Sequence, residues 1–219
     1  MDVLILGATG MVGQGVLREC LLDGGVTRVV TLGRTATRQK HPKLREIVHS
    51  NLLDLSAVED QLIGLDACFY SLGASAAGLS EAEYARINYE MTLAVAETLA
   101  RLNPGMTFIY VSGTGTDRSE RGRVMWARVK GRTENALLRL PFKAAYMLRP
   151  GLIVPMHGVR SKTRLYRVFY TVMTPFLPVL KALFPRAIIT TEQLGRAMLR
   201  LARSGYSKHV LETADIAAL

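Results

Sequence analysis

The stretch that decides the fold is Gly7-Ala8-Thr9-Gly10-Met11-Val12-Gly13, which follows the apolar run at residues 3–6 and opens a helical segment. Its spacing is G-x-x-G-x-x-G. The first glycine permits a tight turn, the second lets the backbone approach a pyrophosphate, and the third lets the helix pack close to the strand. The helix N-terminus also offers free N–H groups and a partial positive charge to phosphate. The stretch therefore predicts a nucleotide-binding turn contacting the cofactor through Gly7, Thr9, Gly10, Met11, Val12 and Gly13, with a ligand-free glycine turn as the alternative.

The rest of the chain alternates short apolar runs with helical segments. The runs are at residues 3–6, 29–32, 47–48, 67–70, 108–111 and 145–148, and continuous runs of this length are typical of strands covered on both faces. Between them, residues 80–102 open with a capping box of Ser80 and Glu83. A buried stripe then recurs at spacings of three to four: Tyr84, Asn88, Met91, Val95, Leu99 and Leu102. The alternation predicts an α/β fold with a Rossmann-type, doubly wound parallel sheet and right-handed crossovers.

The 219 residues favour a single domain, because a chain of this length can bury a large core. After Pro150 the alternation weakens. Residues 165–184 are nearly long enough to cross a bilayer, but two basic residues and two prolines interrupt them, so a spanning helix is not expected. Thr190 and Gln193 resemble a second capping box, which opens a helix to about residue 203. A short apolar run, Val210-Leu211, and a small helix near 214–218 follow.

Cofactor choice is decided where the second predicted strand ends. An acidic residue there would bind the 2′-hydroxyl of NAD. Here the strand ends in Gly33-Arg34-Thr35. Because an arginine suits a 2′-phosphate through charge-assisted hydrogen bonds, Arg34, assisted by Arg38, favours NADP. The alternative is that Arg34 is only a solvated surface charge.

Taken with three downstream segments, these features resemble the short-chain dehydrogenase/reductase superfamily. The closest likeness is to its atypical branch of NmrA-like and Tat-interacting-protein-like members. The segments are Tyr70-Ser71-Leu72-Gly73-Ala74-Ser75, Tyr110-Val111-Ser112-Gly113-Thr114-Gly115 and Trp126-Ala127-Arg128-Val129-Lys130-Gly131, and Arg149-Pro150-Gly151-Leu152-Ile153 is similar to the family as well. The resemblance covers nearly the whole chain, and it implies an NAD(P)-dependent oxidoreductase in which residues 155–190 form a lid over the substrate.

The resemblance also implies roles for individual residues. Asp54 would bind the adenine, Leu72 and Gly73 would lie along the adenine ribose, and Lys130 would hold the nicotinamide ribose. Pro150 and Ile153 would lie beside the carboxamide. Ser112, Lys130 and Asn88 are the candidate catalytic residues. Asn88 has independent support as the polar member of an apolar stripe, since a buried amide needs partners, although a structural amide that bonds the backbone is an equal alternative.

The chain departs from this family at its catalytic tyrosine. The family signature is Y-x-x-x-K, in which tyrosine and lysine face one way on a helix and the tyrosine exchanges the proton. Here Trp126 stands in the tyrosine position, and its indole N–H cannot act as an acid near neutral pH. Ser112 could then be only a strand-end hydroxyl, and Lys130 only a cofactor-binding cation. Thr114 and Thr116 are possible pocket residues without being obvious proton donors, and Tyr84 is a candidate to reach the nicotinamide.

The charge is placed unevenly. The formal net charge is +10, and residues 117–167 hold 13 basic and 3 acidic side chains, so the remainder of the chain is neutral. Three interpretations compete: a solvated rim, an anion-attracting mouth of the cleft, and a membrane-surface contact through residues 160–184. Nucleic acid is not expected as a partner, because no binding motif or aromatic platform accompanies the charge.

Cysteines and the N-terminus bear on location and metal binding. Cys20 and Cys68 lie in apolar surroundings without metal-ligand spacing, and the four histidines are scattered, so neither a disulfide nor a metal site is expected. This pattern suits a reducing compartment, and we expect a cytoplasmic protein, with the inner face of a membrane as an alternative. Residues 1–7 are typical of a buried strand and not of a signal peptide.

Two functions follow from these patterns. The first is an atypical NADP-dependent oxidoreductase acting on an unidentified, hydrophobic small molecule, such as a quinone, flavin or conjugated acceptor that takes its proton from water. The second is a non-catalytic NADP(H)-binding module that senses the nucleotide or docks on a partner or membrane. The sequence names neither the substrate nor the oligomeric state.

Overall fold

The computed structural model describes residues 1–159 and 187–219. In these residues seven parallel strands form one sheet in the order β3-β2-β1-β4-β5-β6-β9. The strands are β1 (Asp2–Leu6), β2 (Arg28–Gly33), β3 (Leu44–Val48), β4 (Ala67–Tyr70), β5 (Thr107–Val111), β6 (Ala144–Arg149) and β9 (Val210–Glu212). The order reverses between β1 and β4, which is where nucleotides bind in doubly wound folds. The predicted fold class is confirmed.

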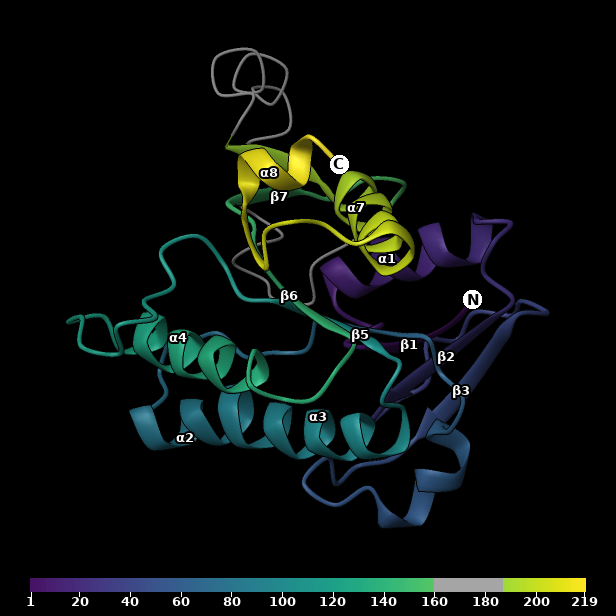
Figure 1. Ribbon diagram of the computed structural model, residues 1–219, viewed down its shortest axis with the longest axis horizontal. Coiled ribbons are helices and arrows are strands. Elements are labelled where there is room, and N and C mark those ends of the chain that lie inside the picture. Colours follow the sequence, from purple (N-terminus) through teal and green to yellow (C-terminus); the bar gives the residue numbers. More distant parts are fainter. Residues whose placement is uncertain (160–186) are drawn as a thin grey trace.

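Helices cover both faces of this sheet (Figure 1). One face carries α1 (Met11–Leu22), α7 (Thr191–Ser204) and α8 (Thr213–Ala217), and the other carries α3 (Met91–Leu102), α4 (Met125–Leu137) and the 3₁₀ helix η1 (Ser56–Leu62). Each face has its own apolar cluster because both sides of every central strand are buried. Both predicted capping boxes, at Ser80 and Thr190, are present.

The segment predicted as one helix over residues 80–102 is interrupted. It runs as α2 (Glu81–Ala85), a π-helical turn η2 (Arg86–Glu90) and then α3. The turn centres on Asn88, whose main-chain oxygen accepts hydrogen bonds from the hydroxyls of Thr92, at 3.0 Å, and Thr133 on α4, at 3.1 Å. Single π turns inside α-helices often mark functional sites, and this one faces the candidate site described below.

The packing of α1 against α7 is unusually close. A Cβ added to Gly15 would lie 2.5 Å from the Thr191 Cβ, and one added to Gly195 would lie 2.8 Å from the Glu19 Cγ. The Glu19 carboxylate is buried and pairs with Arg196 across the interface. These contacts fix the position of α1 against α7.

The C-terminal part contains a feature that the sequence did not indicate. Strands β7 (Leu152–Val154) and β8 (Ile188–Thr190) pair in parallel as a separate two-stranded sheet. Most of the predicted lid at 155–190, and the predicted membrane contact at 160–184, lie outside the described residues, so both stay predictions, as does the single-domain organisation. Of the helices in the described ranges, none combines the length and the hydropathy needed to span a bilayer.

Candidate functional site

The glycine turn has the geometry that its spacing predicts. Gly7 has a φ of +83°, and its oxygen accepts a hydrogen bond from the Gly10 N–H at 2.8 Å. A Cβ added to Gly13 would lie 2.1 Å from that same oxygen, so only glycine lets α1 pack this close. The N-cap of α1 has no side-chain hydrogen bond, and among the described residues the N–H groups of Met11 to Gly13 have no backbone partner. These donors are free for a phosphate.

A first cleft of about 320 Å³ opens beside this turn. It is lined by Gly7, Ala8, Thr9, Thr31, Leu32, Gly33, Arg34, Thr35, Thr37 and Leu72. Arg34 is exposed at its rim, and no acidic side chain is among the lining residues. Arg38 lines an adjoining hollow of about 430 Å³, which shares Ala8 and Thr9 with the first cleft. Arginine without a competing carboxylate fits a phosphorylated ribose.

A second cleft of about 370 Å³ shares Leu72 with the first. It is lined by residues 71–77, which follow β4, and by Tyr84, Val111, Ser112, Trp126 and Lys130. Gly73, Ser112 and Lys130 thus come together as the sequence predicts. Polar atoms make up more of this lining than apolar ones, and Trp126 and Tyr84 are its largest side chains. The two clefts adjoin at Leu72, and their lining residues follow the carboxyl ends of β1, β2, β4 and β5.

Lys130 places a buried cation in this second cleft. Its side chain is 8% exposed, and burial lowers its pKa from 10.5 to about 8, although the nearby Glu134 carboxylate opposes that change. Among the described residues its only hydrogen bond, at 3.5 Å, runs to the Val111 oxygen, and its Nζ lies 4.9 Å from the centre of the Tyr110 ring. The Lys130 ammonium has three N–H donors, and in the described part of the chain only one of them has this long hydrogen bond to a protein oxygen. The other donors can therefore bind a ligand, such as a ribose diol.

Asn88 lies beside the second cleft without lining it. Its Oδ1 accepts from the Ala74 N–H at 3.3 Å, and its Nδ2 donates to the Tyr84 oxygen at 3.1 Å. A Cβ on Gly73 would approach that Oδ1 to 2.9 Å. The amide therefore has the contacts of a structural residue that fixes the loop after β4, and its catalytic role stays a prediction.

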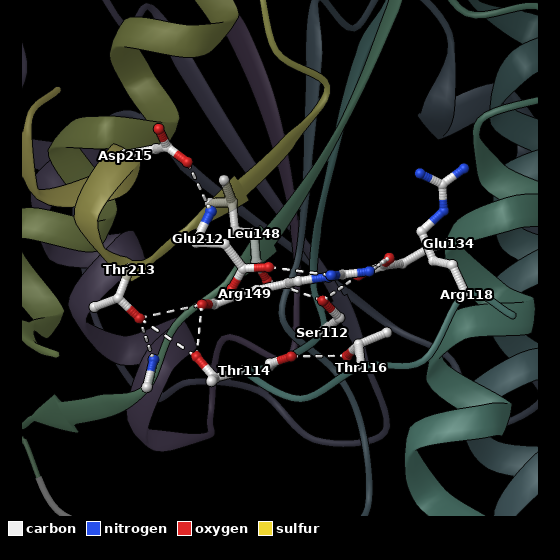
Figure 2. Close-up of polar contacts among 12 residues, drawn as sticks. Ser112, Thr114, Thr116, Arg118, Glu134, Leu148, Arg149, Glu212, Thr213 and Asp215 are labelled. Carbon is white, nitrogen blue, oxygen red and sulfur yellow. Dashed lines mark hydrogen bonds and ion pairs between the residues drawn. The ribbon is translucent and has the colours of Figure 1, made fainter. Parts of the chain in front are cut away.

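Ser112 is held by a buried ion pair. Its Oγ donates to Glu134 Oε1 at 2.6 Å and lies 3.1 Å from the Leu148 oxygen. Glu134, on α4, is completely buried, and Arg149 bonds both of its carboxylate oxygens, at 3.0 and 2.6 Å. Figure 2 shows Arg149 extended between Glu134 and Glu212, to which it also donates at 3.0 Å. The hydrogen bonds to Glu134 raise the pKa of Arg149 above its ordinary value.

The remaining candidate residues lie elsewhere. Asp54 is exposed, and its carboxylate accepts from the Ser56 N–H, which lowers its pKa; it is not among the residues lining either cleft. Met11 and Val12 pack against the core. Pro150 precedes β7 and Ile153 lies within it, and neither lines the first or the second cleft. The contacts predicted for their side chains stay predictions.

Two threonines bond the backbone outside the clefts. Thr114 donates to the Arg149 oxygen at 3.1 Å, and Thr116 donates to the Gly113 oxygen at 2.7 Å. Tyr84, in contrast, lines the second cleft, and burial raises its pKa to about 12. Its phenol is therefore protonated at neutral pH and close to the position that Trp126 occupies.

Comparison with known proteins identifies the family. Residues 3–117, just over half of the chain, match the family described as NAD dependent epimerase/dehydratase. The chain belongs to this family. The NAD dependent epimerase/dehydratase family is of the short-chain dehydrogenase/reductase type, which confirms the predicted superfamily; the likeness to NmrA-like members and the choice of NADP over NAD stay predictions.

Solved structures of a dehydratase and an epimerase share the fold. The dTDP-glucose 4,6-dehydratase DesIV of Streptomyces venezuelae, with NAD and TYD bound, has a TM-score of 0.71 at 16% identity. The alignment with DesIV includes 97% of this chain and 75% of the DesIV chain. A UDP-N-acetylglucosamine 4-epimerase of Methanobrevibacter ruminantium has a TM-score of 0.72 at 16% identity, with 96% of this chain covering 75% of it.

Curated relatives in this family correct the expected location. The mitochondrial protein fmp52 of Aspergillus niger is 31% identical over 173 residues, which are 74% of this chain and 70% of the relative. The fmp52 protein of Emericella nidulans is 29% identical over 170 residues, again 74% and 70%. Because both are named mitochondrial, the cytoplasmic prediction is wrong. Buried, unpaired cysteines indicate a reducing compartment and cannot distinguish one such compartment from another.

Sequence reasoning missed Glu134 and Arg149 in this family member. Glu134 is one of only three acidic residues in the basic stretch, and it lies four positions after Lys130, hence on the same helix face. That spacing was the available signal. No group of three or more potential metal ligands occurs in residues 1–159 and 187–219.

Proposed function

We propose that this chain is an NADP(H)-dependent oxidoreductase that acts on a small, hydrophobic substrate. The observation that carries the proposal is that the two clefts adjoin: Leu72 lines both, Arg34 lines the first and the buried Lys130 lines the second. A dinucleotide has its phosphates in the middle and a nucleoside at each end, and the glycine turn that leads to the open N–H groups of α1 lines the first cleft at Gly7, Ala8 and Thr9.

Arg34 supports NADP. It follows β2 directly, where NAD-binding members of this fold carry an acid, and its guanidinium has no hydrogen bond within residues 1–159 and 187–219. A 2′-phosphate would give it a charge-assisted, bidentate partner. The exposed Arg38 adds a second positive charge beside the same cleft.

Lys130 and the large side chains of the second cleft support an oxidoreductase. NADPH, when bound, supplies a hydride. Lys130 would hold the adjoining ribose with its unused donors, while Leu72, Val111, Tyr84 and Trp126 exclude water and contact an apolar substrate. Because Trp126 cannot give a proton, we propose a substrate that takes it from water, such as a quinone, flavin or conjugated acceptor, with the Tyr84 phenol as the other available donor.

The test is NADPH consumption across a panel of carbonyl, quinone and flavin acceptors. We expect at least one acceptor to oxidise NADPH, with a rate that Lys130→Ala lowers by more than its effect on NADPH binding. If no acceptor is reduced and Lys130→Ala changes binding alone, the oxidoreductase proposal is wrong. NADH run in parallel measures the cofactor preference.

A second candidate is a non-catalytic NADP(H)-binding module, and one arrangement favours it. Trp126 replaces the proton donor, and the Ser112 hydroxyl is occupied by Glu134. Trp126→Tyr distinguishes the two: a module would gain carbonyl reductase activity from this change, whereas an existing enzyme would only show altered substrate preference.

For location we propose the mitochondrion, on the names of the relatives. A fluorescent fusion of the full chain tests it, and a diffuse cytosolic signal would contradict it.

A further inference from the structure

The buried carboxylate of Glu134 determines the direction in which the Ser112 hydroxyl donates its hydrogen bond. Glu134 is completely buried, and three hydrogen bonds reach its two oxygens, two from Arg149 and one from Ser112 at 2.6 Å (Figure 2). Arg149 is 13% exposed and is also held by Glu212. The pair is therefore anchored by α4, β6 and β9, and it presents a fixed acceptor to the hydroxyl at the end of β5.

Ser112 has a single hydroxyl proton to donate. In residues 1–159 and 187–219, two groups lie within hydrogen-bond distance of its Oγ, the Glu134 carboxylate and the Leu148 oxygen at 3.1 Å, and both can only accept. Whichever of these two oxygens it bonds, the Ser112 hydroxyl proton is unavailable to a ligand in the second cleft. Because Ser112 also lines the second cleft, what it can offer a ligand there is an oxygen lone pair.

We propose that Glu134 is a positioning residue that fixes Ser112 as a hydrogen-bond acceptor, so that the second cleft recognises a ligand through a hydroxyl or N–H group and disfavours a carbonyl oxygen at that place. The proposal rests on the proposed function, since the ligand meant is the substrate bound beside Lys130. It narrows the acceptors proposed above to those that also carry a hydroxyl or N–H group, such as a hydroxyquinone or a flavin.

A neutral carbonyl cannot compete for the serine proton. Hydrogen bonds to an ionised carboxylate are roughly twice as strong as neutral ones. Turning the Ser112 hydroxyl toward a carbonyl would take one of the two donors from the buried Glu134 Oε1, leaving Arg149 alone, and would exchange a charge-assisted hydrogen bond for a weaker neutral one. A ligand O–H can instead donate to the Ser112 oxygen without disturbing the pair.

The experiment compares two ligands that cannot react with NADP⁺: 1-methylcyclohexanol, a tertiary alcohol, and cyclohexanone. Their dissociation constants are measured by ligand-detected NMR on the full chain, with NADP⁺ present and again without it. We expect the wild-type protein to bind the alcohol about tenfold more tightly than the ketone.

Three variants isolate the cause. Ser112→Ala should reduce the alcohol-to-ketone ratio to about one. Glu134→Gln should lower or reverse it, because a side-chain amide can donate to the Ser112 oxygen and release the serine proton toward the ligand. Thr114→Val is the matched control, since it removes a hydroxyl from the same loop that lines neither cleft, and it should leave the ratio unchanged.

The outcomes separate this inference from the proposed function. A wild-type preference for the ketone, or a tenfold ratio that survives Ser112→Ala, overturns the inference while leaving NADP⁺ binding intact. Failure of NADP⁺ to bind overturns the proposed function, and the ligand pair measured on the protein alone still decides the role of Ser112. If Glu134→Gln does not fold, the comparison of Ser112→Ala with Thr114→Val remains decisive.

Discussion

Replacing Lys130 with methionine should make the protein more stable and less able to bind its nucleotide. Burial holds the Lys130 pKa at about 8, against 10.5 in the unfolded chain. A tenfold difference in proton affinity is worth about 1.4 kcal/mol, so keeping this ammonium charged in the folded state costs about 3 kcal/mol at pH 7. Methionine fills a similar space without a charge. We expect Lys130→Met to raise the free energy of unfolding by about that amount.

The increase in the free energy of unfolding caused by Lys130→Met should become smaller as the pH rises. Between pH 8 and 10.5 the unfolded wild-type chain binds a proton at Lys130 that the folded chain has released, so wild-type stability from this group rises with pH. The advantage of Lys130→Met therefore falls from about 3 kcal/mol at pH 7 to about 2 kcal/mol at pH 9 and vanishes above 10.5. Taking the difference between the two proteins removes the other groups that titrate at alkaline pH.

Urea unfolding monitored by circular dichroism at pH 7, 8 and 9 measures this difference. Lys143→Met is the matched control, because Lys143 is exposed, and its change should stay within about 0.5 kcal/mol at every pH. A Lys130→Met protein that is less stable than wild type at pH 7, or an advantage that does not shrink by pH 9, would refute the reasoning. NADPH titration of the same samples should show a loss of affinity in the variant.

Three further changes probe the nucleotide groove and its supporting loop. Gly13→Ala places a methyl group against the Gly7 oxygen and should abolish NADPH binding and lower stability by about 1–3 kcal/mol, measured by titration and urea unfolding. Arg34→Ala should weaken NADPH about 10- to 100-fold and leave NADH unchanged in parallel titrations. Asn88→Ala should lower stability by about 1–3 kcal/mol, as both hydrogen bonds of a buried amide are lost, and an activity assay should show the Michaelis constants change more than the turnover rate.

Each of these changes has a control on the same protein. Gly24→Ala meets no atom within 4 Å and should be neutral, and Arg45→Ala on β3 should not alter NADPH binding. Equal weakening of NADPH and NADH by Arg34→Ala would show that the arginine does not read the 2′-phosphate. A turnover rate abolished by Asn88→Ala in a fully stable protein would favour the catalytic role over the structural one.

The central sheet could be predicted because burial on both faces produces a recognisable sequence. Continuous apolar runs predict β1, β2, β4 and β5. The capping boxes at Ser80 and Thr190 predict where the following helices begin, because each pairs two side chains three residues apart. β3 was predicted too short, because Arg45 and Glu46 interrupt its apolar pattern at the edge of the sheet, where one neighbour is missing.

What escaped prediction depends on contacts between distant residues. The π turn at Asn88 is stabilised by the hydroxyl of Thr133, 45 positions later, and nothing in the local sequence specifies that partner. The hydrogen bond between Ser112 and Glu134 joins residues 22 apart, and Arg149 completes the pair from a third element. The sequence indicated which residue types surround the groove, but their mutual hydrogen bonds needed the tertiary structure.

The tight contact between α1 and α7 has a consequence for how the chain folds as it is synthesised. The ion pairs Glu19–Arg196 and Asp23–Arg203 join residues 177 and 180 positions apart. The apolar side of α1 stays uncovered until residues 191–204 have left the ribosome, while the opposite face of the sheet can be completed by residues up to about 147. We expect one half of the molecule to form early and the half that contains α1 to close later, which leaves α1 exposed to chaperones until α7 has been synthesised.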